Sequence, residues 1–191
     1  SYLDTLNEQN GGGLTADATS AFQIFQADAV SGSPNRGTTI NNNTASWPYY
    51  HAVFIDRNDG HKMKYFVADR NNHRVLIFNG LPTGNTATAD AVLGQTSLTA
   101  GLINAGGGAT ISAQGFNEPC GVAVRNSGEV LVVDRANNRV VIFASVPTSL
   151  GTWNAYRVIG QPNMASGTAN NFSVANGGKL NDPSAVHVID G

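Results

Sequence analysis

A long phrase occurs twice in this chain, and this repeat constrains the fold more than any other feature. Residues 66–78 recur as residues 131–143 with eight of thirteen residues identical, and both copies contain the motif Asp-Arg-x-Asn-x-Arg. The aspartates of the motif, Asp69 and Asp134, lie 65 positions apart. Self-similarity at a fixed period of this length is the signature of repeat proteins, so the sequence predicts a series of equivalent structural units.

Two further repeated phrases mark where each unit begins and ends. An apolar segment followed by glycine closes the units, at Gly32, Gly94 and Gly160. A proline followed by a second apolar segment opens them, at Pro48, Pro119 and Pro183. The single domain, residues 1–191, is therefore divided into a partial unit at 1–47, full units at 48–118 and 119–182, and the first strand of a further unit at 183–191.

Each full unit shows the pattern of four short β-strands. Runs of β-branched residues bounded by turn residues are typical of strands. In the second full unit these runs predict strands at 121–125, 130–134, 139–143 and 156–160. No long segment shows the apolar periodicity of a helix. Because four-stranded antiparallel sheets that repeat radially form a β-propeller, the sequence predicts an all-β fold of propeller blades.

The Asp-Arg-x-Asn-x-Arg motif is interpreted as the corner between the second and third strands of a blade. An aspartate carboxylate can accept backbone N–H groups two residues further on, and asparagine tolerates a positive φ angle. The arginine offers a planar fork of donors to that aspartate or to the next blade. Because a residue present in every unit serves what every unit shares, a structural role is predicted for the whole set. These blade-corner residues are Asp69, Asn72, Arg74, Asp134, Asn137 and Arg139.

These motifs resemble those of the NHL-repeat family of β-propellers. The similarity is close in residues 119–143, where Pro-x-Gly-Val-Ala-Val is followed by Asp and then by Asn-x-Arg-Val-Val-Ile-Phe, and it is looser in residues 48–78. The units are longer than typical NHL repeats, which resembles the variant found in bacterial secreted or envelope proteins. The resemblance implies a β-propeller. It also implies that some relatives bind RNA through a basic face and that others are lyases with channel histidines and a metal.

The number of units predicts a partial propeller. A propeller closes with about four to eight blades, whereas 191 residues at a period of 65 make nearly three units. An open end would leave unpaired backbone groups and an apolar blade face exposed. We therefore expect completion by a partner chain, as in a homodimer of three plus three blades, or by residues of a longer chain.

Charge and hydropathy exclude two classes of partner. The net charge is −2 with only 11 Lys and Arg, so the chain has no basic surface for nucleic acid. No apolar run approaches the length of a membrane span. Charged residues make up only 13% of the chain, and asparagine, glycine, serine and threonine take their place. This composition favours an extracellular or periplasmic location.

Candidate metal ligands and nucleophiles are few. The first strand of each blade lines the central channel, and these strands carry His51 and His187. A metal-dependent lyase or hydrolase with a channel site is therefore the alternative function, but the two histidines fall one place apart relative to their prolines. Residues 56–60 favour a hairpin turn over a calcium loop. Cys120 is interpreted as a small buried residue. No metal, no catalytic residue and no cofactor is expected.

The long connections between blades are the predicted binding face. Residues 95–118 and 161–182 are much longer than ordinary loops, and long loops on a rigid scaffold are usually functional or disordered. Their amides and occasional aromatic residues suit a neutral polar ligand, although such residues also satisfy irregular backbone. The candidate binding residues are Asn104, Gln114, Phe116, Asn117, Asn163, Asn170 and Phe172. The predicted function is a non-catalytic interaction scaffold that binds protein or glycan through this loop face.

Overall fold

The computed structural model describes residues 34–37, 39–46, 48–56, 62–84, 86–172 and 176–189. Of Arg36, Asn171 and Phe172 it describes the backbone alone. The predicted partial unit at 1–47 lies mostly outside the described residues. Outside them too are all but the first residue of the predicted turn at 56–60 and the last two residues of the predicted strand at 183–191.

The described residues form two four-stranded antiparallel sheets, so the predicted all-β fold class is confirmed. The first sheet contains β1 (Pro48–Asp56), β2 (Lys62–Asp69), β3 (Arg74–Phe78) and β4 (Ala91–Leu93). The second contains β5 (Pro119–Val124), β6 (Val130–Asp134), β7 (Arg139–Phe143) and β8 (Arg157–Ile159). In each sheet the spatial order of strands is the chain order. Both sheets therefore have the connectivity of a propeller blade, and we call them blade 1 and blade 2.

The remaining regular elements are five short 3₁₀ turns, and no α-helix occurs in the described ranges. They are η1 (Pro34–Gly37), η2 (Arg70–Asn72), η3 (Ile103–Gly106), η4 (Arg135–Asn137) and η5 (Ala169–Phe172). Two of them, η2 and η4, join the second and third strands of their blades. Of the other three, η1 precedes blade 1, η3 lies between the two blades and η5 follows blade 2.

The repeat in sequence becomes a repeat in strand register. Asp69 pairs with Arg74 across β2 and β3, and Asp134 pairs with Arg139 across β6 and β7. The first pair of strands in each blade shows the same register shift just after its opening proline. Since register decides which face each side chain occupies, equivalent residues lie on equivalent faces of the two blades.

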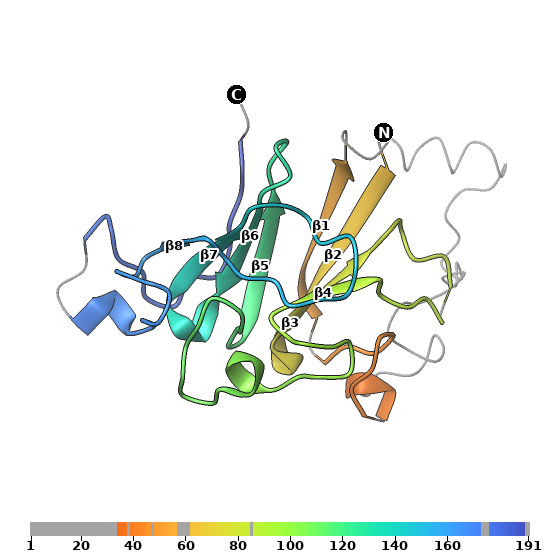
Figure 1. The fold of residues 1–191 in the computed structure, drawn as a ribbon, viewed down its shortest axis with the longest axis horizontal. Coiled ribbons are helices and arrows are strands. Elements are labelled where there is room, and N and C mark those ends of the chain that lie inside the picture. The colour runs from red at the N-terminus through yellow and green to blue at the C-terminus, as the bar shows by residue number, and fades with distance from the viewer. Residues whose placement is uncertain are drawn as a thin grey trace, which may run out of the picture.

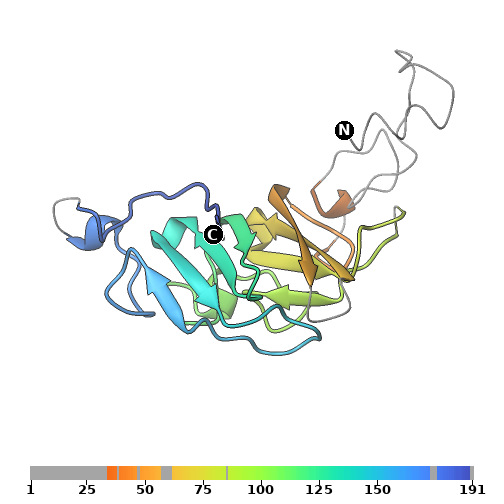
Figure 2. The ribbon, with the colours of Figure 1, turned by 90° about the horizontal axis from the view of Figure 1, so that it is seen from above.

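The two blades lie side by side, with β5 against β1 and β2 (Figure 1). Seen from above, the sheets of blade 1 and blade 2 lie next to each other, and the segment that follows β8 turns back toward β5 (Figure 2). The main core fills the space between the blades. It contains Phe66, Ile77 and Leu93 from blade 1, which meet Val132 and Phe143 from blade 2.

Each blade has a leading face, which points toward the next blade in the chain. In blade 1 this face carries Phe66, Val75, Ile77 and Leu93, and in blade 2 it carries Leu131, Val140, Ile142 and Ile159. Blade 2 covers the leading face of blade 1, so Leu93 is fully buried. The leading face of blade 2 packs against Leu180, Val186 and Val188 instead. These residues belong to the segment at 180–189, which follows the second blade.

The segment at 183–189 occupies the place that β5 occupies relative to blade 1. The thiol of Cys120 on β5 lies 3.4 Å from the carbonyl oxygen of Pro183 and 3.3 Å from that of Ser184. A Cβ added at Gly121 would lie 3.3 Å from the Cα of Ala185. Unlike β1 and β5, however, this segment takes part in no β-ladder of the described residues.

Candidate functional site: blade corners and loop face

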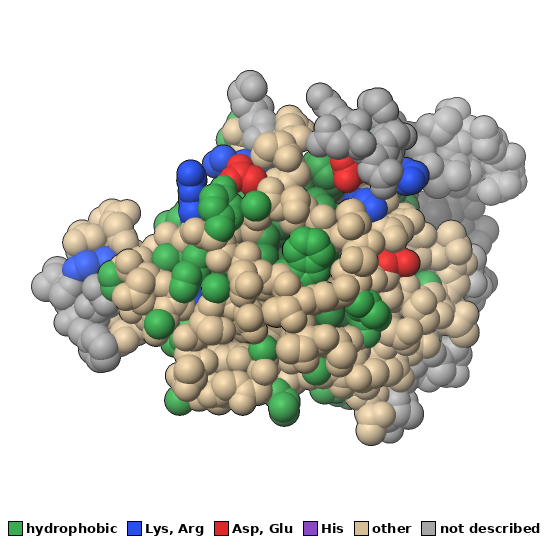
Figure 3. Space-filling view, in the orientation of Figure 1, with side chains coloured by type: hydrophobic (Ala, Val, Ile, Leu, Met, Phe, Trp, Pro, Cys, Tyr) green, Lys and Arg blue, Asp and Glu red, His purple; other side chains and the backbone are tan. Residues whose placement is uncertain are grey.

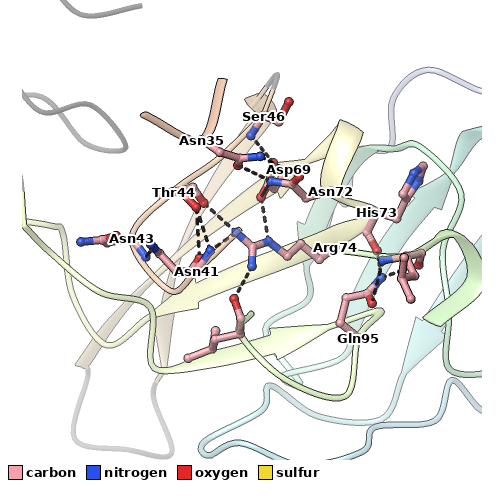
Figure 4. Close-up of polar contacts among 12 residues, drawn as sticks. Asn35, Asn41, Asn43, Thr44, Ser46, Asp69, Asn72, His73, Arg74 and Gln95 are labelled. Carbon is pink, nitrogen blue, oxygen red and sulfur yellow. Dashed lines mark hydrogen bonds and ion pairs between the residues drawn. The ribbon is translucent and has the colours of Figure 1, made fainter. Parts of the chain in front are cut away.

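The corner of blade 1 is built around a fully buried ion pair. The Nε of Arg74 donates to Oδ2 of Asp69 at 2.7 Å, and neither side chain has exposed surface. Asn72 donates to the same oxygen at 2.8 Å, and the backbone N–H of Ser46 donates to Oδ1 at 2.7 Å (Figure 4). The carboxylate is thus held by three donors, which is what a buried charge requires.

The rest of the Arg74 guanidinium binds the loops on both sides of the blade. It donates to the carbonyl oxygens of Asn41 at 3.0 Å and Thr44 at 2.6 Å, which precede β1. It also donates to the carbonyl oxygen of Leu98, which follows β4 (Figure 4). One side chain therefore ties the entrance and the exit of the blade to its corner.

Blade 2 repeats this corner donor for donor. Arg139 donates to Asp134 at 2.7 Å, and both side chains are fully buried. Its remaining nitrogens donate to the carbonyl oxygens of Ser112 at 2.9 Å, Gly115 at 3.1 Å and Met164 at 2.6 Å. These contacts show a structural arrangement that both repeat copies share.

The corner turn differs in two details from the sequence prediction. Neither aspartate accepts a backbone N–H of its own turn, whose only donor to it is the motif asparagine side chain; the backbone N–H that each accepts comes from the residue two places before the opening proline, Ser46 or Asn117. The positive φ angle falls on His73 and Asn138, one residue after the motif asparagine. The turn is closed by a 3₁₀ element, which frees the carboxylate for the preceding loop.

Burial dominates the electrostatics of the corner. Removal from water raises the pKa of Asp69 above its usual value, and the charge of Arg74 and the hydrogen bond from Asn72 oppose this rise. Burial likewise raises the pKa of Asp134, and the charge of Arg139 is the main influence that opposes this rise. Because the aspartates and arginines have no exposed surface, these charges are placed to hold loops and not to meet a ligand.

A second charged contact joins the blades at the same end of the molecule. Arg70 of blade 1 and Arg135 of blade 2 both donate to the carboxylate of Glu118, the latter at 3.1 Å. The hydrogen bond from Arg70 holds the pKa of Glu118 below its usual range. Arg135 also pairs with Asp182 at 2.8 Å. Arginines and acids thus alternate along this edge, from Arg70 to Asp182.

Two of the predicted binding residues lie in the interior. Asn104 accepts a hydrogen bond from Asn137 at 2.8 Å and donates to the carbonyl oxygen of Gly108 at 2.7 Å. Phe116 has no exposed surface and meets Phe143 edge to face, with ring centroids 6.0 Å apart. A Cβ on Gly94 would overlap the Phe116 ring. In this structure both side chains support the loop at 95–118 and do not line its surface.

The other predicted binding residues are scattered along the loops. Gln114 and Asn117 are partly buried, and Asn163 is exposed, with its side chain accepting from the N–H of Ala165 at 2.9 Å. Asn170 has a left-handed backbone, and its N–H donates to the carbonyl oxygen of Leu180 at 2.9 Å. The side chain of Phe172 lies outside the described residues. Whether these residues bind a ligand stays a prediction.

The structure adds two apolar residues to the loop face that the sequence reasoning missed. Leu102 is 66% exposed and Ile103 is 42% exposed, next to each other at the start of η3. Gln95 fixes this point by donating to the carbonyl oxygens of His73 at 2.9 Å and Leu102 at 2.8 Å. In Figure 3 the lower part of the molecule, where the long loops of Figure 1 lie, shows uncharged polar surface with scattered hydrophobic side chains.

The two histidines of the alternative prediction line one groove. His51 on β1 and His187 lie with Val122 on β5 along the groove where the first strands of the units meet. His51 stacks on Tyr65, whose hydroxyl lies 2.6 Å from Nδ1, and burial lowers the pKa of His51. Within the described part of the chain, no three potential ligands gather to form a metal site.

Cys120 fits the structural interpretation. Its side chain is buried, and burial raises the pKa of its thiol to about 11. Because the thiolate is the nucleophile and the metal ligand, this environment keeps the residue unreactive at neutral pH.

The architecture and its buried corners define a class: repeated four-stranded blades of a β-propeller. Residues 116–143 match the family model of the NHL repeat. The chain therefore carries an NHL repeat, which confirms the resemblance to this family over the blade 2 corner and its flanking strands. No curated protein matches the chain in sequence. Within the described residues, no helix is long and apolar enough to cross a membrane.

Proposed function

We propose that this protein is a non-catalytic scaffold that binds another protein through its loop face. The loop face consists of residues 95–118 and the described part of 161–182. The observation that carries the proposal is the fixed display of Leu102 and Ile103. Adjacent exposed apolar side chains on an anchored loop are suited to protein contact, since contact regions are enriched in apolar anchors and depleted of charge.

The same surface favours a protein over a glycan as the ligand. The sequence argument for a glycan combined amides with the aromatic side chain of Phe116, and that ring is in the core. Leu102 and Ile103 offer no hydrogen-bonding side-chain groups, so they match an apolar patch better than a sugar. NHL repeats are propeller blades, and repeat scaffolds present broad surfaces while varying their loops.

Site-specific photocrosslinking in the organism that encodes the protein tests this function. A benzophenone amino acid replaces Leu102 on the loop face, and in a control variant it replaces Ser127, at the opposite end of the blades. We expect a protein adduct of defined mass from position 102 and none from position 127. Equal adducts at both positions, or none at position 102, would contradict the proposal.

The proposal also includes two predictions from the sequence, on the location of the protein and on the completion of the propeller ring. The low content of charged residues, 13%, and the long polar loops support an extracellular or periplasmic location in a bacterium. Fractionation of the native cells tests it, and a protein found in the cytoplasmic fraction would contradict it. The second part is completion of the ring, either by a partner chain, of which a homodimer is the simplest form, or by further residues of a longer chain. Light scattering coupled to intact-mass measurement tests the homodimer.

A further inference from the structure

A turn in the loop face folds the side chain of one asparagine over the backbone that follows it. The Oδ1 of Asn176 accepts the N–H of Gly178 at 2.9 Å. Turns closed in this way by a side-chain oxygen are typical of asparagine in loops. The turn brings the side-chain amide of Asn176 close to the backbone of Gly177, which lies between the donor and the acceptor.

The same turn occurs at the equivalent position of the other units. Asn41, Ser112 and Asn176 each stand seven residues before an opening proline. The Oδ1 of Asn41 accepts the N–H of Asn43 at 3.0 Å (Figure 4), and the Oγ of Ser112 accepts the N–H of Gln114 at 3.3 Å. The carbonyl groups of Asn41 and Ser112 bind the corner arginines. The turn is therefore a feature of the repeat, and Asn176 adopts it for a structural reason.

Only the third copy of the turn has a glycine at its second position. That position holds Asn42 and Ala113 in the first two copies and Gly177 in the third. Asn176, Gly177 and Gly178 are exposed, and a Cβ added at Gly177 would meet nothing within 4 Å. Because glycine has no side chain to hinder close approach, its backbone nitrogen is accessible to the folded-back amide.

From this arrangement we propose that Asn176 is a modification site, which converts spontaneously to aspartate and isoaspartate. The backbone nitrogen of Gly177 attacks Cγ of Asn176, the bond between Cγ and Nδ2 breaks, and a proton from the attacking nitrogen leaves with the amide nitrogen as ammonia. Water then opens the cyclic succinimide, at Cγ to give aspartate or at the backbone carbonyl carbon to give isoaspartate. The turn supplies proximity, and the N–H of Gly178 donates to Oδ1, where negative charge develops during the attack.

A second Asn-Gly step in the described residues lacks the turn. Asn79 precedes Gly80, and its Oδ1 accepts from the Nζ of Lys64 at 2.7 Å. Lys64 is only 3% exposed, and the N–H of Asn79 donates to Asp90 at 2.8 Å. The side chain of Asn79 is thus anchored on β2, so it reacts more slowly than that of Asn176. The remaining Asn-Gly step, at residues 10–11, lies outside the described residues.

The reaction changes the charge of the loop face. The two segments that form this face contain three charged residues, Glu118, Lys179 and Asp182. Conversion of Asn176 adds one negative charge to them. An effect of this charge on partner binding rests on the scaffold function proposed above, whereas the reaction itself does not.

Peptide mass spectrometry of the purified protein tests the proposal. The protein is incubated at mildly alkaline pH in isotopically labelled water, so that only carboxyl groups formed during the incubation carry the label. In the folded protein we expect Asn176 to convert about tenfold or more faster than Asn79 and Asn41, with isoaspartate among the products. In urea, Asn79 and Asn176 should convert at similar rates, because both precede glycine and the fold no longer separates them.

Gly177→Ala is the variant that tests the attacking nitrogen. It should slow conversion of Asn176 about tenfold or more, since a Cβ hinders ring closure. It should leave urea unfolding unchanged, because the added Cβ meets open space. Gly84→Ala is the matched control: a Cβ there also meets nothing within 4 Å, and conversion of Asn176 should proceed at the wild-type rate.

Three results would overturn the proposal. Asn176 converts no faster than Asn79 in the folded protein, aspartate forms without isoaspartate, or Gly177→Ala converts as fast as the wild type. The second result would indicate direct hydrolysis of the side-chain amide. These measurements use no partner, so crosslinking from position 102 tests the scaffold function separately.

Discussion

Blade 1 and blade 2 have the same corners and different neighbours. The ion pairs Asp69–Arg74 and Asp134–Arg139 have the same length and the same complete burial. Yet Leu93 is buried where its counterpart Ile159 is half exposed. The comparison teaches that the corner is a property of the repeat itself, whereas the burial of the leading face depends on what stands next to it. This is the behaviour of quasi-one-dimensional repeat proteins, in which stability combines unit and interface contributions.

The largest expected effect comes from breaking a corner. Arg74→Ala and Arg139→Ala should each lower the free energy of unfolding by about 3–5 kcal/mol, because each leaves a buried carboxylate without its partner. Urea denaturation measures this. The control is Arg125→Ala, which removes an exposed ion pair with Glu129 and should cost about 1 kcal/mol or less. A loss in one blade without a similar loss in the other would show that the corners are not equivalent.

Truncating an apolar side chain on the leading face should lower the free energy of unfolding less than breaking a corner does, and by different amounts in the two blades. Leu93→Ala should lower the free energy of unfolding by about 2–5 kcal/mol, the usual cost of a cavity in a packed core. Ile159→Ala should cost about 1 kcal/mol or less, since its side chain is half in water already. Thermal and urea unfolding of both variants measure the difference between the two losses in the free energy of unfolding. Equal losses would mean that Ile159 is covered in solution by something that the described residues do not include.

Much of the fold was predictable from local sequence. The strands around Asp134 and Arg139 were predicted at their observed positions, because short β-branched runs and turn residues act over a few neighbours. The donor to each aspartate was not predictable in this way. It comes from Ser46 or Asn117, which lie 23 and 17 positions earlier, and only the folded chain brings them together.

On the loop face, the sequence prediction and the structure differ at Phe116, which is fully buried. Phe116 was assigned to the binding surface because it lies in a long polar loop. A signal against this was present: Ala45, Phe116 and Leu180 each stand three residues before an opening proline. An apolar residue that repeats with the period is expected in the core, and Phe116 and Leu180 do contact Gly94 and Gly160 in the same way. No such signal marks Leu102 and Ile103, since their counterparts in the second unit, Thr168 and Ala169, are not large apolar residues.

The smallest expected effect lies in one residue at which the two corners differ. The N–H of Glu118 donates to Nδ1 of His73 at 3.1 Å, and in blade 2 the N–H of Asp182 donates instead to Oδ1 of Asn138 at 2.9 Å. Only the histidine can lose its acceptor by protonation. Burial lowers the pKa of His73, although Glu118 opposes this.

Because the pKa of His73 is lower in the folded protein than in the unfolded chain, acid favours unfolding at this residue. Its contribution to stability should be complete above about pH 6.5, the pKa of a free histidine, and should be lost as the pH falls through the folded value. We expect a loss of about 1 kcal/mol, the net worth of one hydrogen bond. Urea unfolding at pH 7.5 and pH 5 measures it. The change in the free energy of unfolding between the two pH values should become smaller in His73→Asn, which places the blade 2 residue in the blade 1 corner. It should become larger in Asn138→His. An unchanged difference in His73→Asn would mean that other groups, such as His51, cause the pH dependence.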